Sequence, residues 1–202
     1  MKEGLDLKQE NIHVLHERMK MKLYSLESPI ESGGDVVDIN DSKGRISSYF
    51  IWNEGNGSFL KFTTPQGVAQ KNIKYSDISE VDFLSANIGV PIFSEKAMHE
   101  INNFIPEIIE WAKIVISCNG DDVIYNLCKV NNFLDLIDKE NSLFRILSDG
   151  DRILSKAVYK KDLKDDFIIA RDINFKERLV VSQSFVDFCH SRNIKISFDV
   201  QI

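Results

Sequence analysis

The serines best placed for nucleophilic chemistry occur in two similar stretches, "GVPIFSEKAMHEI" at residues 89–101 and "RLVVSQSFVDFC" at residues 178–189. In each, a short apolar run precedes the serine, Ser94 or Ser182, and an amphipathic segment follows it. A nucleophilic serine needs a histidine and an acid nearby, and neither serine lies in the G-x-S-x-G elbow that exposes such a nucleophile. Because serine is strongly preferred at helix N-caps, we interpret both as structural caps.

Histidine is the next candidate, and the chain has four: His13, His16, His99 and His190. His13 and His16 are three residues apart, so a helix places them on one face, but a metal site there needs a further ligand such as Glu10 or Glu17. We interpret this pair as exposed helix positions. His99 falls on the polar side of a predicted helix, and His190 at the end of another, where a cationic imidazole suits the helix dipole.

The cysteines, Cys118, Cys128 and Cys189, are odd in number, widely spaced and set among apolar residues. This pattern indicates buried free thiols rather than disulfides or a metal cluster. Cys189 adjoins His190, but neighbours in a helix point in different directions, so a Cys–His nucleophile is disfavoured. The glycines match neither the P-loop nor the dinucleotide fingerprint. We expect no catalytic, metal-binding or cofactor-binding residues.

Carboxylates gather at three predicted turns: Asp121 with Asp122, Asp149 with Asp151, and Asp165 with Asp166. If two of these loops meet, they form a negative rim suited to a cationic partner surface. The net charge of −6 disfavours a nucleic-acid binder, which needs clustered positive charge. The densest basic stretch, residues 156–164, is diluted by aspartates.

The elements that position these residues follow from hydrophobic periodicity. Residues 21–28 alternate as a strand, and the segments 45–53 and 58–64 predict a β-hairpin across "EGNG". A second hairpin is predicted around the Asn119–Gly120 turn. Trp52 and Trp111 fall in strand-like runs, which places them in the core.

Both opening stretches then read as strand, capping serine, helix and strand. The predicted fold class is α+β, with a mixed, largely antiparallel sheet flanked by a few helices and containing these two units. We divide the chain into a helical extension at residues 1–20, where Ile12, Leu15 and Met19 form a helical stripe, a β-rich lobe at 21–80, and an α+β domain at 81–202, all packed as one unit.

The location follows from what the sequence lacks. Residues 1–22 are charged throughout, unlike a secretory signal. No run approaches the roughly 20 apolar residues that span a bilayer. We therefore expect a soluble, cytoplasmic protein without a membrane partner.

Three segments together carry a family resemblance: "DFLSANIGVPIFSEKAMHEI" at 82–101, "YNLCKVNNFLDLIDKENS" at 125–142 and "DFIIARDINFKERLVVSQSFVDFCHSRNIKISF" at 166–198. In this order they resemble a bacterial family of immunity proteins of polymorphic toxin systems, formerly a domain of unknown function. The match covers roughly the C-terminal 120 residues and the "KLYSL" start. It departs where the family's Phe-Arg pair appears here as "IAR", ending at Arg171.

This resemblance implies a non-catalytic protein that binds a cognate toxin and neutralises it by steric occlusion. The acidic net charge is compatible with a basic surface on that toxin. Two alternatives stay open: an adaptor or chaperone for a secreted effector, and a hydrolase with dispersed acids such as Asp135 and Asp138. Asp138 and Ser142 of the family motif suit a turn that needs local hydrogen bonds.

Overall fold

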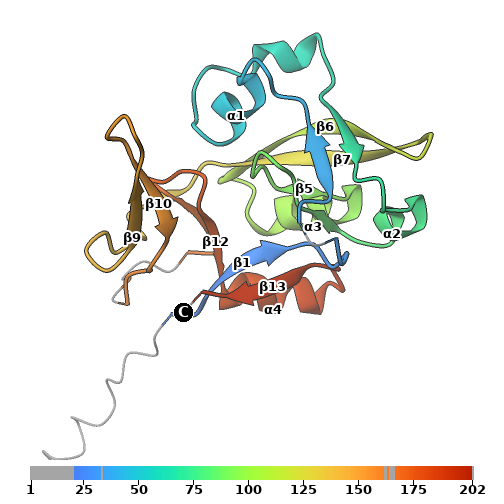
Figure 1. Cartoon of the computed structure of the whole chain (residues 1–202). Helices are drawn as coiled ribbons and strands as arrows, with labels where there is room; N and C mark the ends of the chain where they lie inside the picture. Colours follow the sequence, from blue (N-terminus) through green and yellow to red (C-terminus); the bar gives the residue numbers. More distant parts are fainter. Residues whose placement is uncertain (1–20, 33, 162, 164–166, 202) are drawn as a thin grey trace, which may run out of the picture.

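The computed structural model describes residues 21–32, 34–161, 163 and 167–201, and the predicted extension at 1–20 lies outside them. The fold is α+β, as the sequence predicts, with two sheets and a separate hairpin (Figure 1). The six-stranded sheet has the order β2 (Val37–Ile39), β3 (Gln66–Ala69), β6 (Ile109–Cys118), β7 (Asp121–Val130), β5 (Ile92–Phe93) and β4 (Phe83–Leu84). The five-stranded sheet has the order β13 (Ser197–Val200), β1 (Leu23–Glu27), β12 (Leu179–Ser182), β11 (Ile169–Asp172) and β8 (Phe133–Leu134).

The helices connect and cover these sheets, while β9 (Leu143–Ile146) and β10 (Arg152–Lys156) pair only with each other. The described part of the chain contains the helices α1 (Arg45–Phe50), α2 (Tyr75–Ser79), α3 (Glu95–Phe104) and α4 (Gln183–Ser191), and the 3₁₀ turn η1 (Ser58–Lys61). Most strand pairs are antiparallel, and the pairs β3–β6 and β8–β11 are parallel. None of the described helices is long and apolar enough to cross a membrane.

The predicted hairpin around Asn119–Gly120 is confirmed and forms the centre of the larger sheet. β6 and β7 pair over ten residues each, and both turn residues have positive φ, 54° and 100°. Asn and Gly tolerate this left-handed backbone, which matches the twist of a two-residue hairpin. The inner face of β6 and β7 packs into one hydrophobic cluster with α1 and α2, and Ile114, Ile116 and Leu127 are fully buried there.

The two predicted strand–Ser–helix–strand units are also confirmed. The first runs β5–α3–β6 in the larger sheet, and the second runs β12–α4–β13 in the smaller one. Both helices contribute to a second hydrophobic cluster, which contains Ile101, Phe185 and Cys189. The rings of Phe104 and Phe188 stack at 4.1 Å between centroids. The helices of the two repeated units therefore pack against each other in a shared core.

The predicted strand at residues 45–53 is wrong, because this segment contains helix α1. Its aromatic and β-branched residues favour a strand, but Ile46 and Phe50, four residues apart, are both buried on one helical face. The carboxylate of Asp41 accepts hydrogen bonds from the backbone amides of Ile46 and Ser47, at 3.0 and 2.8 Å. Local capping and helical spacing together override strand propensity here.

The second strand of that hairpin, at residues 58–64, is wrong for a similar reason. Asn56 accepts a hydrogen bond from the amide of Ser58 at 3.1 Å, and the chain turns into η1. The core placement of the tryptophans is also wrong: Trp52 is 39% exposed and Trp111 is 47% exposed. Trp52 follows a helix, and Trp111 occupies an exposed position on the face of β6 opposite the one that packs against α1.

The two capping serines differ in what their hydroxyls do. Ser94 accepts a hydrogen bond from the amide of Ala97 at 3.1 Å and donates to the carboxylate of Asp82. Ser182 occupies the N-cap of α4, but its buried hydroxyl has no hydrogen-bond partner among the described residues. The predicted cap position is thus confirmed twice, and the predicted capping bond once.

This difference gives the first prediction. Ser94→Ala should lower the free energy of unfolding by about 1–2 kcal/mol, because it removes a cap and leaves the Asp82 carboxylate short of a donor. Ser182→Ala should change it by less than about 0.5 kcal/mol, because no bond is lost. Urea unfolding followed by circular dichroism measures both. Equal destabilisation by the two substitutions would show that Ser182 also forms a cap in solution.

Candidate functional site

The predicted nucleophile candidates do not come together. His99 is exposed on α3 and lies within 3.2 Å of Asn103, and His190 is exposed at the end of α4 with its ring edge-on to Phe198. His13 and His16 lie outside the described residues. Cys189 is fully buried beside His190, so thiol and imidazole face different environments.

The three cysteines are buried free thiols, as predicted. Burial raises the pKa of Cys128 and of Cys189 to about 12, and it also raises the pKa of Cys118. A thiol acts as a nucleophile through its thiolate. At neutral pH these side chains therefore act as small apolar groups in the core.

The carboxylates considered for a hydrolase serve the local structure. Asp138 accepts hydrogen bonds from the backbone amides of Glu140 and Asn141 and from the Asn141 side chain, and this last bond is the main reason why its pKa is lowered. Ser142 donates to the carbonyl of Asp138 at 2.6 Å and accepts from the amide of Val158 at 2.9 Å. This confirms their predicted role in a turn. Asp135 forms an exposed salt bridge with Lys160.

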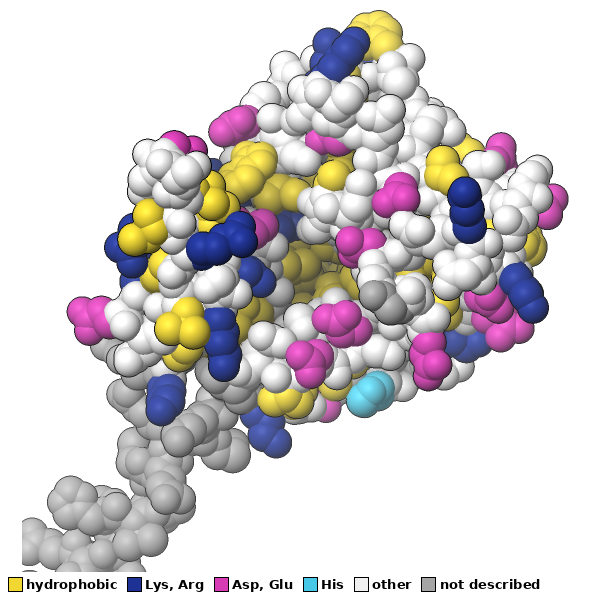
Figure 2. Space-filling model, in the orientation of Figure 1, with side chains coloured by type: hydrophobic (Ala, Val, Ile, Leu, Met, Phe, Trp, Pro, Cys, Tyr) yellow, Lys and Arg dark blue, Asp and Glu magenta, His cyan; other side chains and the backbone are white. Residues whose placement is uncertain are grey.

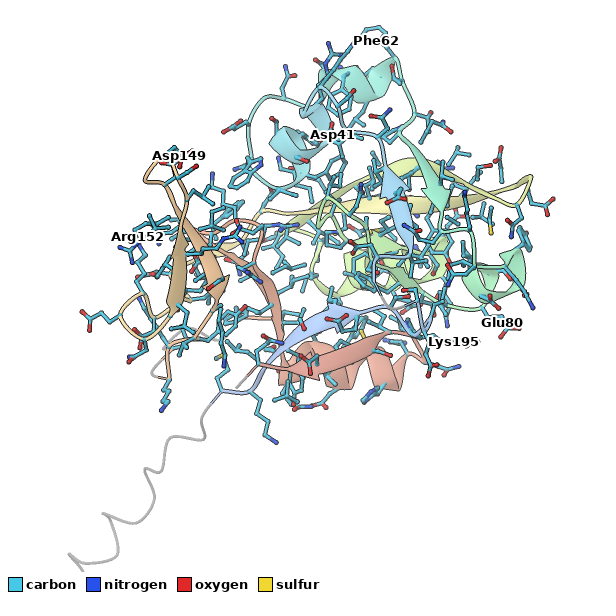
Figure 3. All side chains as sticks on the ribbon, viewed as in Figure 1. Asp41, Phe62, Glu80, Asp149, Arg152 and Lys195 are labelled. Atoms are coloured by element: carbon cyan, nitrogen blue, oxygen red, sulfur yellow. The ribbon has the colours of Figure 1, made fainter. Side chains whose placement is uncertain are left out.

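The acidic loops also stay apart. The turn between β6 and β7, with Asp121 and Asp122, and the tip of the β9–β10 hairpin, with Asp149, point to opposite sides of the molecule (Figures 1 and 3). Asp165 and Asp166 lie outside the described residues. The negative rim predicted from these loops is therefore not formed by the two that the structure describes.

A different set of residues forms a hollow of about 490 Å³ between the two sheets, which we call the main cleft. Its floor is apolar and includes Phe83, Ala86, Val90 and Pro91. Figure 2 shows an apolar hollow on this face, with acidic side chains mainly along its right and lower edges and Lys and Arg side chains along its left edge. The exposed carboxylates that line it are those of Glu27, Asp35, Glu177 and Asp199.

The β1–β13 ladder positions one wall of the main cleft. Ser25 pairs with Asp199 and Glu27 pairs with Ser197, so these side chains share one face of the sheet. Gln201 donates from its side chain to Ser25 and to the Asp199 carboxylate, both at 3.1 Å, and Ser25 donates to Glu27 at 3.3 Å. This chain of hydrogen bonds holds two carboxylates in place without neutralising either.

A second hollow of about 550 Å³, the side cleft, adjoins the main cleft along the same ladder. Ser197 lines the side cleft and is the register partner of Glu27, which lines the main cleft. The carboxylates of the side cleft belong to Glu31, Asp77 and Glu80. Figure 3 shows Glu80 beside Lys195, the one cation that lines this cleft.

The charge of this surface is strongly unbalanced. Seven carboxylates line the two clefts, against the two cations Lys195 and Arg178. Within the described part of the chain, none of the seven takes part in a salt bridge. Unpaired carboxylates around apolar hollows create a negative potential that favours cationic groups. We call this surface, formed by the two clefts, the acidic face.

A buried cation lies beneath the main cleft. Arg171 is fully buried and donates to the carbonyl of Lys176 at 2.8 Å and to the carbonyl of Gly89, a cleft residue, at 3.5 Å. Burial lowers its pKa to about 10, and the charge of Glu177 opposes that change. Arg171 therefore joins β11 to the loop that forms the cleft floor.

Among the described residues that line the acidic face there is one phenol, Tyr159, and no histidine or cysteine. Over the described residues, no group of three or more His, Cys, Asp or Glu side chains is arranged to hold a metal ion. Burial raises the pKa of Tyr159, which lines the main cleft, so its phenol is a neutral group there. What the arrangement offers is a shaped, negatively charged surface.

Comparisons with known proteins do not bear on the role of the acidic face. No family model matches the chain, and no curated protein matches it in sequence. Sequence reasoning missed the acidic face because its carboxylates come from separate segments of the chain. None of those segments has a motif, and only the pairing of β1 with β13 brings Glu27 and Asp199 together.

The burial of the thiols gives the second prediction. With Ellman's reagent near the ordinary thiol pKa of about 8.5, the native protein should react at least about a hundredfold more slowly than the protein unfolded in guanidinium, because exposure of the thiols requires opening of the core. Release of thionitrobenzoate measures the rate, with the denatured sample as the control. A single fast-reacting cysteine in the native protein would mean that one thiol is accessible for chemistry.

Proposed function

We propose that this chain is an immunity protein that binds a cognate bacterial toxin and neutralises it by steric occlusion, without catalysis. The observation that carries the proposal is the acidic face, with its seven carboxylates around two adjoining hollows. The resemblance of residues 82–198 to immunity proteins indicates that the partner is a toxin.

The physical chemistry of the acidic face suits an inhibitor of a basic protein. Opposite charges on two surfaces accelerate their encounter and exclude partners of the wrong sign. The half-buried side chains of Leu26 and Leu179, which line the main cleft, offer apolar area that becomes dry on binding. A standard specific interface buries roughly 1,600 Å² in total, which the acidic face and its surroundings can supply.

We propose no catalysis because the candidate catalytic groups have structural roles. Asp138 is held by hydrogen bonds in its own turn, Asp135 pairs with Lys160, and the thiols are buried. An inhibitor that works by occlusion needs none of these as reactants. We therefore expect protection to be stoichiometric with the toxin.

The third prediction reverses charge on the acidic face. Against a candidate toxin encoded by a neighbouring gene, the double variant Glu27→Lys, Asp199→Lys should lose most of the growth protection that the wild type gives, because it places two cations opposite a basic surface. The matched control is Glu107→Lys, Glu140→Lys, which changes two exposed residues that line neither cleft and alters the net charge equally. Growth on co-expression and pull-down of the toxin are the measurements.

Two further results bear on the same experiment. Wild-type binding to the toxin should weaken as salt rises from about 0.05 M to about 0.5 M, because exposed charges are screened. Equal protection by both double variants would contradict the role of the acidic face. Tight binding without protection would instead identify an adaptor, and turnover of toxin by substoichiometric protein would identify an enzyme.

A further inference from the structure

Strand β13 presents an open edge beside the acidic face. The amide of Gln201 donates to the carbonyl of Leu23 at 2.8 Å. In an antiparallel ladder, residues that bond to the partner strand alternate with residues that point away. The backbone N–H and C=O groups of Gln201, Asp199 and Ser197 point toward β1. The backbone groups of Phe198 and Val200 therefore point outward. Within the described residues, no backbone hydrogen bond satisfies them on that side.

The other strand edges are shorter or carry features that discourage pairing. At the remaining sheet ends, β2 has three residues, β4 and β8 have two each, and β9 has four residues that include the cation Arg145. β10 is longer, but it has a register shift and the cations Arg152 and Lys156. Charges, bulges and short length are the usual protections of an edge. β13 has four residues, no lysine, arginine or proline, and an exposed Val200 at 60%.

The two faces of β13 differ in chemistry. Ser197 and Asp199 lie on the side of the clefts, with Glu27. Phe198 lies on the opposite side, where its ring contacts those of Tyr24 and Phe185. Val200 shares that side, because side chains alternate along a strand. In a strand added to this edge, every second side chain would therefore lie on the cleft side, near the carboxylates. The side chains between them would lie on the opposite side, near the apolar groups.

We propose that the open edge of β13 binds an extended segment of the partner protein as an added strand, and that this segment alternates cationic and apolar residues. Main-chain hydrogen bonds from Phe198 and Val200 supply the pairing, as in other complexes formed by strand addition. The charge complementarity comes from Asp199 and Glu27. The inference rests on the proposed function for the partner's identity, but its test needs only a peptide.

The probe is a synthetic eight-residue peptide of alternating lysine and valine, added to the full chain. We expect binding by isothermal calorimetry and changes in the backbone amide resonances of Phe198 and Val200 in NMR spectra. The decisive variant is Val200→Pro, which removes an outward N–H and leaves the bonds to β1 intact. The matched control is Val200→Thr, which keeps the N–H and a β-branched side chain.

Val200→Pro should weaken peptide binding about tenfold or more. This is the loss of affinity expected when one backbone hydrogen bond is removed and the proline ring hinders the adjacent one. Val200→Thr should bind within about threefold of wild type, because the backbone is unchanged. A peptide N-methylated on alternate amides, and one with glutamate in place of lysine, should both fail to bind. Unfolding curves establish that both variants are folded.

Several results would overturn the inference. These are equal binding by the proline and threonine variants, binding of the N-methylated peptide, or amide changes confined to residues away from β13. Failure of the proposed immunity function can be distinguished from failure of strand addition. Loss of toxin protection in the charge-reversal variant together with no peptide binding would retain the acidic face as the interface and reject strand addition. Peptide binding without toxin protection would retain the open edge and reject the immunity function.

Discussion

The carboxylate of Asp82 is the point at which the two halves of the fold are joined. It is only 7% exposed, yet it accepts hydrogen bonds from the hydroxyl of Ser94 and from the amide of Lys195 at 2.8 Å. Its own backbone amide and carbonyl bond to the same two residues, at 3.0 and 3.1 Å. One residue thus ties the start of α3 to the segment that leads into β13. A buried carboxylate is costly unless several donors satisfy it, and here the donors come from both repeated units.

Two more buried charges hold β11 in place, and one of them, Arg171, also reaches the larger sheet. The carboxylate of Asp172 accepts from the amides of Leu136 and Ile137, both at 3.0 Å, and from two amides of the turn that follows β11. Arg171, its neighbour, reaches across to the carbonyl of Gly89. Because the sheets are joined by such point contacts and by a shared helical core, they do not fuse into one continuous sheet. The main cleft is the space that remains between them.

The sequence predicts those parts of the fold whose signals are local. The Asn119–Gly120 hairpin, the helix after Ser94 and the helix after Ser182 follow from turn chemistry and helical spacing within a few residues. The strand predicted at 45–53 is wrong because strand propensity and helical spacing compete there. Asp41, whose carboxylate accepts from the first amides of α1, lies outside that segment. Trp111 shows another limit: alternation identifies two faces of a strand, but only the tertiary fold decides which face is covered.

The acidic face was beyond prediction for a stronger reason, since it depends on strand order. Glu27 and Asp199 are far apart in the chain and become neighbours only because β13 returns to pair with β1. The hydrogen bonds through Ser25 and Gln201 then fix these carboxylates before any partner arrives. Side chains that are already ordered lose less entropy on binding, so preorganisation raises affinity without new contacts. The same fixed negative charges repel acidic partners, which gives selectivity at no cost to the fold. The proposed inhibition by occlusion would use this acidic face and the open edge of β13, because occlusion depends on shape and charge and needs no reacting group.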